Sequence, residues 1–447
     1  SRPRSAAAAE SDGAYLERAA VGEQCRLGPR GGVAEGRWLP VQLPDSSCLL
    51  LQRRSACRPS MLLPRGAAKK RRAELRGLEK REKHGKGTMS DTNVNESLVR
   101  AALAEFKDPE SGRSIVQMDQ VRGVRLEDGK LEVALGLTTW SAPLWDSTRS
   151  ELIEHLRKRF PSLDATVDLV IHERKPEKMG EIGLSVKNVI AVGSGKGGVG
   201  KSSVAAYLAC GLKRAGCVVG LMDADLYGPS IPHLFGSRER PEIRDERIQP
   251  VVVDGLPIMS MGFLVPEEEA VIWRGPMLHN ALQQFLRDTA WGDLDYLIVD
   301  MPPGTGDVAI SLSQLLPLSG AVVVCTPQDV ALLDAVKAVS MFRKVNIDVL
   351  GMVENMSFFL CPSCDSRHDI FGSGGAKRRA EALGVPFLGE VPICTELRVL
   401  SDEGRVCEAF DQPRPQPYLE AICRSLVANL SAAARRKPKM PTLPVLG

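Results

Sequence analysis

Hydrophobic residues recur at two different spacings in the first patterned part of the chain. From Glu96 to Phe106 they fall at helical spacing, and Asp108-Pro109 ends the run. Farther on, apolar and polar residues alternate around Asp128-Gly129, a dipeptide typical of a hairpin turn. The pattern predicts a small α+β domain with a helix over 96–106, a β-hairpin over 124–137, a second helix over 152–160 and a closing strand over 167–171.

After Lys187 the pattern changes to short β-branched runs separated by helical stretches. Continuous apolar runs of this kind are typical of buried parallel strands. Right-handed crossovers then place ligands at the carboxyl ends of the strands. The expected strands are 189–192, 218–222, 297–299, 321–325, 349–353 and 387–391, with helices over 202–215 and 419–430. The fold class is therefore α/β, a mostly parallel, doubly wound sheet preceded by the small α+β domain.

The two ends of the chain differ from this middle part. Residues 1–88 are rich in Arg, Ala, Gly and Pro without sustained periodicity, so we expect a disordered basic extension. It lacks the apolar stretch of a secretory signal, and acidic residues such as Glu10 and Glu17 disfavour a transit peptide. We favour Met89 as the natural start. The expected layout is an extension over 1–88, the small domain over 93–175, an α/β domain over 185–430 and a flexible tail over 431–447.

The distribution of charged residues along the chain indicates which partners the protein can bind. The net charge of +3 hides an asymmetry, because residues 1–88 hold 19 Lys/Arg and 9 Asp/Glu, which leaves 39 bases and 46 acids for residues 89–447. An acidic folded part disfavours a protein that coats nucleic acid. No apolar run reaches the roughly 18 residues that a membrane span needs. We expect neither nucleic acid nor membrane as a partner.

The chain has 11 cysteines, an odd number, and eight lie in the part that resembles an intracellular α/β enzyme. Disulfides are the less favoured interpretation. We expect a reducing, cytoplasmic compartment, with one close pair, Cys361 and Cys364, kept for metal or redox chemistry.

The strongest chemical signal follows the strand that ends at Val192. Gly195 to Ser202 has the spacing GxxxxGK[ST] of a phosphate-binding P-loop, placed between a predicted strand and a predicted helix. The glycines let backbone N–H groups converge on phosphate, Lys201 meets the β and γ oxygens, and Ser202 is a Mg²⁺ ligand. Lys196 is a second lysine that can neutralise phosphate. The expected nucleotide-binding residues are Gly195, Lys196, Gly197, Gly198, Val199, Gly200, Lys201, Ser202 and Ser203.

Acidic residues at the ends of two predicted strands complete a phosphoryl-transfer centre. Asp300 follows an apolar strand, as expected of a carboxylate in the Mg²⁺ shell. Asp223 and Asp225 end the strand after the P-loop helix, and one of them can polarise the attacking water. Asp at a strand end also serves helix caps and turns, and for Asp223 that alternative is equally favoured.

Cys361-Pro362-Ser363-Cys364 is the single CxxC of the predicted folded part. It is open to structural zinc, dithiol redox chemistry, an iron–sulfur cluster or no chemistry. A thioredoxin-like position is excluded because the motif does not open a helix after the first strand. A site with four thiolates needs a second pair, so two chains would have to share it. His368 could be a third ligand, although a lone loop histidine is more often not one.

Together these motifs resemble the Mrp/ApbC (Nbp-like) branch of the deviant P-loop ATPases related to MinD and ParA. The resemblance extends from Glu96 to about Val406. It rests on the P-loop, on the segments 223–230, 300–307 and 354–357, and on the CxxC followed by Ile370-Phe371-Gly372.

This resemblance implies an ATP-hydrolysing carrier of iron–sulfur clusters that acts as a homodimer. It implies that Lys196 reaches the partner's nucleotide, that Asp225 lies by the attacking water and that Asn355 contacts adenine. Cys361 and Cys364 of both subunits would bind one [4Fe-4S] cluster, received from cluster donors and passed to apo-proteins. The small domain resembles an iron–sulfur assembly module, but its segment Thr138 to Pro143 lacks the cysteine of many relatives.

Two other functions compete with the carrier. A MinD/ParA-like positioning ATPase would need an amphipathic basic helix at the C-terminus or a basic face on the core. Pro438 interrupts the only basic stretch there, and the folded part is acidic. A zinc-stabilised P-loop ATPase would use Cys361 and Cys364 only as a structural clip, and metal analysis separates it from the carrier.

Overall fold

The computed structural model describes residues 94–176, 178–179, 183–225, 228–264, 275–305, 310, 313 and 316–436. The expected extension over 1–88 and the proposed start at Met89 lie outside the described residues. So do Leu226, Tyr227, Gly306 and Asp307 of the two acidic motifs, and residues 437–447 of the expected tail.

The first described part of the chain is a three-stranded sheet with two helices. Asp128 and Gly129 both have positive φ, 47° and 78°, which a tight hairpin turn between antiparallel strands requires. β3 then pairs with β2 in parallel after a crossover helix. The predicted helix, hairpin, helix and strand are confirmed. The elements are α2 (Glu96–Glu105), β1 (Val121–Glu127), β2 (Lys130–Leu137), the 3-10 helix η1 (Thr139–Leu144), α3 (Trp145–Arg159) and β3 (Asp164–Ile171).

A second sheet holds all six strands predicted after Lys187. In the described residues its order is β14-β13-β12-β5-β11-β6-β10-β9, with β15 beside β13 and β4 beside β5. β9, β14 and β4 are antiparallel to their neighbours, and the other pairings are parallel. The strands are β4 (Lys178–Met179), β5 (Leu184–Ser194), β6 (Val219–Asp223), β9 (Val251–Val253), β10 (Leu256–Ser260), β11 (Leu294–Asp300), β12 (Gly320–Cys325), β13 (Val349–Leu360), β14 (Arg367–His368) and β15 (Phe387–Ile393).

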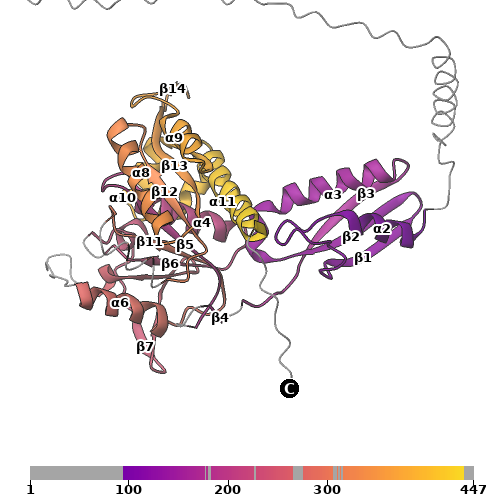
Figure 1. Cartoon of the computed structure of the whole chain (residues 1–447), viewed down its shortest axis with the longest axis horizontal. Helices are drawn as coiled ribbons and strands as arrows, with labels where there is room; N and C mark the ends of the chain where they lie inside the picture. The colour runs from indigo at the N-terminus through magenta and orange to yellow at the C-terminus, as the bar shows by residue number, and fades with distance from the viewer. Residues whose placement is uncertain are drawn as a thin grey trace, which may run out of the picture. The chain divides into compact units, whose positions relative to one another are not determined.

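Helices cover this sheet on both faces (Figure 1). Because side chains alternate along a strand, Ile190 and Val192 of β5 join the core cluster of α4 and α11, whereas Val189 and Ala191 join that of α8 and α9. The doubly wound architecture is confirmed. The helices are α4 (Lys201–Arg214), α5 (Ile231–Leu234), α6 (Gly275–Asp288), α8 (Asp329–Lys344), α9 (Gly375–Leu383), α10 (Thr395–Asp402) and α11 (Gln416–Arg436), with η2 (Met261–Phe263), η3 (Val406–Asp411) and the hairpin β7 (Glu242–Arg244) and β8 (Arg247–Gln249).

The C-terminal helix is longer than the sequence pattern predicts. α11 continues to Arg436, so residues 431–436 belong to a helix and not to the expected tail. Ser431 is buried, and the alanines that follow are strong helix formers, which explains the extension. No helix within the described ranges is both long and apolar enough to cross a bilayer.

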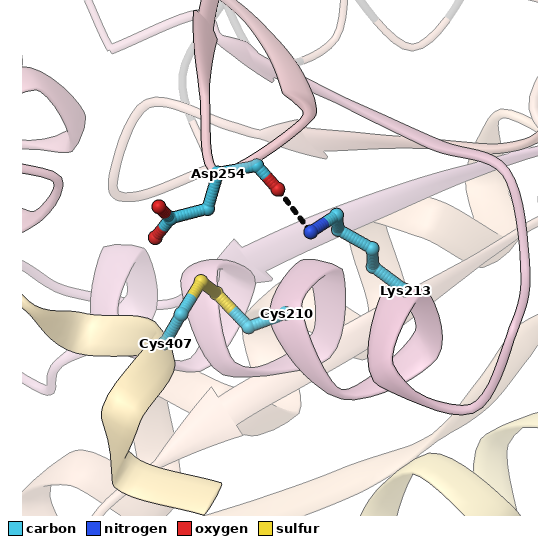
Figure 2. Close-up of a disulfide and its surroundings, with 4 residues drawn as sticks. All are labelled: Cys210, Lys213, Asp254 and Cys407. Carbon is cyan, nitrogen blue, oxygen red and sulfur yellow. Dashed lines mark hydrogen bonds between the residues drawn. A yellow bond between two sulfur atoms is a disulfide. The ribbon is translucent and has the colours of Figure 1, made fainter.

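One pair of cysteines forms a disulfide, contrary to the expectation from composition. Cys210 on α4 is bonded to Cys407 on η3, with their Cα atoms 5.3 Å apart (Figure 2). The two residues are 197 positions apart in the sequence, so no local pattern indicates the pairing. Arg214 also pairs with Asp411 at 2.7 Å, so α4 and η3 are joined twice.

The disulfide yields a stability prediction. Closing so long a loop restricts the unfolded chain, and such bonds typically contribute about 2–4 kcal/mol. We expect dithiothreitol to lower the unfolding midpoint of the wild type, and Cys210→Ala/Cys407→Ala to show the lowered midpoint without reductant. The double variant is its own control, since reductant should not change its midpoint. Identical midpoints for the untreated wild type and the double variant would contradict the prediction.

Candidate functional site

The glycine-rich loop lies between β5 and α4, as the motif predicts. Gly200 has φ 78°, and a Cβ there would overlap the side-chain amide of Asn355. A Cβ on Gly195 would overlap the backbone of Asp334 on α8. These two close approaches explain why the loop needs glycine at both positions. The loop backbone is therefore fitted between α8 and β13 at the start of helix α4, where N–H groups and the helix dipole favour anions.

Lys201 stands at the centre of the site and is 5% exposed. Its ammonium donates to Asp300 Oδ1 at 2.5 Å and to Ser202 Oγ at 3.2 Å. Asp225 Oδ2 lies 3.6 Å from the same nitrogen. The structure thus brings together four predicted site residues from the P-loop, the end of β11 and the segment after β6.

The second oxygen of Asp300 has a different environment. Asp300 Oδ2 is buried and has no hydrogen-bond partner among the described residues. Burial raises the pKa of Asp300, and the neighbouring ammonium of Lys201 acts in the opposite direction. A buried carboxylate oxygen without a partner is costly unless something binds it. This oxygen therefore fits a cation or a cation-bound water.

Asp223 stabilises the turn after β6, and its environment also changes the pKa of its carboxyl group. Its carboxylate accepts from the backbone N–H of Asp225 at 3.0 Å and from the Ser260 hydroxyl at 2.9 Å, which is the turn role weighed from the sequence. Burial, with the nearby Asp300, raises its pKa to about 8. The two oxygens of Asp223 are held in the turn, and Asp225, which lies 3.6 Å from the Lys201 ammonium, is the better placed of the two to interact with a nucleotide-site cation or water.

Asn355 lies on β13 and contacts the P-loop directly. Its side-chain amide donates to the carbonyl of Val199 at 2.9 Å. A side-chain amide has a second donor and an acceptor, so this bond leaves capacity for a ligand. The resemblance implies a contact of Asn355 with adenine, and the structure shows a contact with the P-loop that the sequence did not reveal.

The remaining loop positions follow the motif. Lys196 is half-buried, and its carbonyl accepts from the Ser194 hydroxyl at 2.9 Å. Gly197 and Gly198 are exposed, Val199 is buried, and Ser202 and Ser203 are half-buried at the start of α4.

The two close cysteines lie in a second place, the hairpin loop between β13 and β14. We call residues 361–366 the cysteine loop. The Cys361 N–H donates to the carbonyl of Ser366 at 3.1 Å, and the Asp365 N–H donates to the carbonyl of Cys361 at 3.0 Å. Cys364 is exposed, and hydrogen bonds from Ser366 lower the pKa of its thiol. His368 is on β14, next to the ring of Phe359.

Strand β13 joins the two places. It contains Asn355, at the P-loop, and ends one residue before Cys361. Just before Asn355, the fully buried Glu354 accepts from Ser357 Oγ at 2.6 Å and from the Ala376 N–H of α9 at 2.7 Å. Glu354 therefore connects β13 to α9 through buried hydrogen bonds. A carboxylate at the end of an apolar run indicates such a connection only weakly, and the sequence analysis assigned no role to Glu354.

Comparison with known proteins identifies the family of both parts. Residues 185–427 match the ParA family model described as NUBPL iron-transfer P-loop NTPase, and residues 96–169 match that of an iron-sulfur cluster assembly protein. The chain is 43% identical over 357 residues to the iron-sulfur cluster carrier protein of Deinococcus radiodurans, covering 79% of this chain and 100% of that protein. It is 40% identical over 342 residues to that of Escherichia coli K12, covering 75% and 91%.

Two solved structures are also similar. A nucleotide-binding protein of Archaeoglobus fulgidus in complex with ADP is 42% identical, with a TM-score of 0.46, covering 51% of this chain and 90% of that one. The cell-division ATPase MinD of Pyrococcus furiosus is 20% identical, with a TM-score of 0.41, covering 53% and 97%.

The family match spans more than half of the chain and includes the P-loop, the acidic residues and the cysteine pair. It confirms the resemblance seen in the motifs and the P-loop NTPase fold class. The chain therefore belongs to the NUBPL-type iron-transfer P-loop NTPases.

Proposed function

We propose that this protein binds ATP with Mg²⁺, hydrolyses it slowly, and carries a [4Fe-4S] cluster between two copies of the chain. The cluster is cargo, received from donor proteins and passed to apo-protein clients. One observation carries this proposal: the cysteine loop begins where β13 ends, and the same strand contacts the P-loop through Asn355. Nucleotide and cargo sites are thus attached to one strand.

The nucleotide part of the proposal rests on Lys201. In the structure its ammonium is paired with Asp300. The β and γ phosphates of ATP would compete for this charge, with the N–H groups of the loop as further donors. Asp225 would orient the attacking water, Asn355 would contact adenine, and Lys196 would reach the partner's nucleotide.

The residues present fit Mg²⁺. Asp300 Oδ2 is a buried oxygen without a partner among the described residues, and the Ser202 hydroxyl lies 3.2 Å from the Lys201 ammonium that pairs with Asp300. Oxygen donors of this kind suit Mg²⁺, which retains several waters when bound. Ser202 and Asp300 would hold the ion, which would neutralise charge on the transferred phosphoryl group.

The ligand count supports a shared cluster. A [4Fe-4S] cluster normally takes four thiolates, and the cysteine loop supplies two, Cys361 and Cys364. Within the described ranges, no group of three or more His, Cys, Asp or Glu side chains could hold a metal ion. Two copies of the loop would complete the site, which makes the homodimer part of the proposal.

Two further parts of the proposal follow the sequence. The expected division gives 93–175 as an assembly-type domain, 185–430 as the ATPase and the ends as extensions. A cytoplasmic setting would keep the loop cysteines as free thiols, whereas the Cys210–Cys407 disulfide is the feature that argues against a reducing compartment.

Lys201→Ala tests the nucleotide site. Losing one charge-assisted contact to phosphate should weaken ATP binding roughly 10- to 100-fold and abolish hydrolysis. The variant also leaves Asp300 buried without its cation, which typically costs about 3–5 kcal/mol of stability. ATP affinity, hydrolysis and thermal unfolding should be measured together.

A second variant separates these two effects. Lys201→Ala/Asp300→Asn removes the uncompensated carboxylate, so we expect most of the stability to return while ATP binding and hydrolysis stay lost. Wild-type hydrolysis in a stable Lys201→Ala protein would remove the P-loop from the mechanism.

Iron content tests the cargo site. Anaerobically purified or reconstituted wild type should hold about four irons per dimer. Cys361→Ser or Cys364→Ser should lose nearly all iron, because each dimer then keeps two of four thiolates. Cys325→Ser, at a buried thiol on β12, is the matched control and should keep its iron.

Hydrolysis should persist in both loop variants because the phosphate-binding residues are untouched. Stoichiometric zinc without iron in the wild type, or iron retained in both variants, would favour the zinc-clip function instead.

A further inference from the structure

The side chain of Arg414, which is distant in the sequence, contacts the cysteine loop at two places. Arg414, between η3 and α11, donates through Nη2 to the carbonyl of Pro362 at 2.6 Å. Its Nε lies 2.7 Å from Asp365 Oδ1. Pro362 follows Cys361 and Asp365 follows Cys364, so the guanidinium spans the CxxC from one cysteine to the other.

We infer that Arg414 is a positioning residue for the cargo site, holding the cysteine loop in the shape that presents both thiols to a cluster. The inference rests on the proposed function for its cargo. The planar fork of arginine suits the task, since it can bind a carbonyl and a carboxylate at once in fixed directions. Lysine, a single point charge, cannot reproduce that geometry.

Arg414 is itself firmly held. Its Nη1 donates to Glu396 Oε1 of α10 at 3.0 Å. Pro413 and Pro415 flank it and restrict the backbone on both sides. Upstream, Phe410 of η3 is 1% exposed, and the disulfide from Cys407 ties η3 to α4. The cysteine loop is exposed, but Arg414, which contacts it, belongs to a segment whose backbone is fixed by these contacts.

Charge supports the same role. Asp365 and Glu396 place two carboxylates near the cysteine loop, and Arg414 pairs with both. Glu396 Oε2 is buried without a partner among the described residues, so the carboxylate depends on Arg414 for its opposing charge. Thiolates and a thiolate-ligated cluster are also anionic. Removing Arg414 would leave these negative groups without the cation that pairs with Asp365 and Glu396.

The test uses the full chain and four variants. Arg414→Ala removes both contacts with the cysteine loop. Arg414→Lys keeps the positive charge but lacks the planar guanidinium. Asp365→Asn weakens one of the contacts. Arg405→Ala is the control, because Arg405 lies in the same stretch but pairs with Glu403 and Glu408, outside the cysteine loop.

Hydrogen exchange of the cluster-free protein gives the first readout. The N–H groups of Cys361 and Asp365 are bonded within the loop, so loosening it should speed their exchange. We expect at least about tenfold faster exchange in Arg414→Ala, the factor typical of a lost charge-assisted hydrogen bond. Arg414→Lys should also exchange faster than the wild type, and Arg405→Ala should not.

Iron release from the reconstituted protein to a ferrous chelator gives the second readout. Arg414→Ala should lose iron about tenfold faster or more, with Arg414→Lys between it and the wild type, at unchanged ATP hydrolysis. In the Asp365→Asn background the same Arg414→Ala change should have a smaller effect, because the two residues share a contact.

The outcomes are separable. Exchange and iron release in Arg414→Ala equal to those in Arg405→Ala would overturn the inference. If the wild type takes up no iron, the cargo proposal fails, and exchange alone decides: faster exchange in Arg414→Ala supports the positioning role and unchanged exchange overturns it. Equal effects of Arg414→Ala with and without Asp365→Asn would count against the proposed contact.

Discussion

The buried ammonium of Lys201 is the interaction on which the nucleotide site depends. Only 5% of the Lys201 side chain is exposed. A charge buried to this degree is tolerated only beside opposite charges and hydrogen-bond partners, and Asp300 and Asp225 supply them. Two carboxylates face one ammonium, so the site favours additional positive charge. Burial and the nearby Asp300 also raise the pKa of Asp223, so this third carboxylate holds its negative charge less readily than a free aspartate. A nucleotide accompanied by a divalent cation meets these conditions. Its phosphate can pair with the lysine ammonium, while the cation binds the carboxylate that the ammonium releases.

The features that local sequence encodes were predictable. Alternation of apolar residues indicated the strands, and the spacing from Gly195 to Ser202 indicated the phosphate loop, because both are repeated or short-range patterns. Asp300 was predictable because it ends an apolar strand, and parallel strands bring their carboxyl ends to one edge of the sheet. The CxxC was visible as two thiols at fixed spacing.

The contacts between distant segments were not predictable. Asn355 meets Val199 across 156 positions, Arg414 meets Pro362 across 52, and Cys210 meets Cys407 across 197. No periodicity relates such positions, and only the completed sheet and its helices bring them together. The disulfide was missed for this reason. The end of α11 was missed because Arg and Pro beyond it outweighed an alanine-rich stretch that suits a helix.

The segment from Val406 to Arg414 is attached to α4 near its start and contacts the cysteine loop at its end. At its start, Cys407 is bonded to Cys210 and Asp411 pairs with Arg214, so it is attached to the helix that begins at the P-loop. At its end, Arg414 contacts the cysteine loop. Rigid attachment at one end gives the arginine a defined position at the other, because a side chain can orient a loop only if its own backbone is fixed.

Strand β13 provides the second attachment, and its irregularity matters. Its pairing with β15 changes register between Asn355 and Phe359, and Met356 there has φ 54°, a left-handed conformation unusual for a residue other than glycine. Glu354 stabilises this interruption by accepting from Ser357 and from the first turn of α9. The ladder with β15 is thus interrupted after the P-loop contact, and it resumes at Phe359, which pairs with Ile393. Phe359 and Leu360 also pair with His368 and Arg367 of β14, so backbone hydrogen bonds hold the base of the cysteine loop. Arg414 adds side-chain contacts within the loop itself, at Pro362 and Asp365, beyond the last paired residues of the strand.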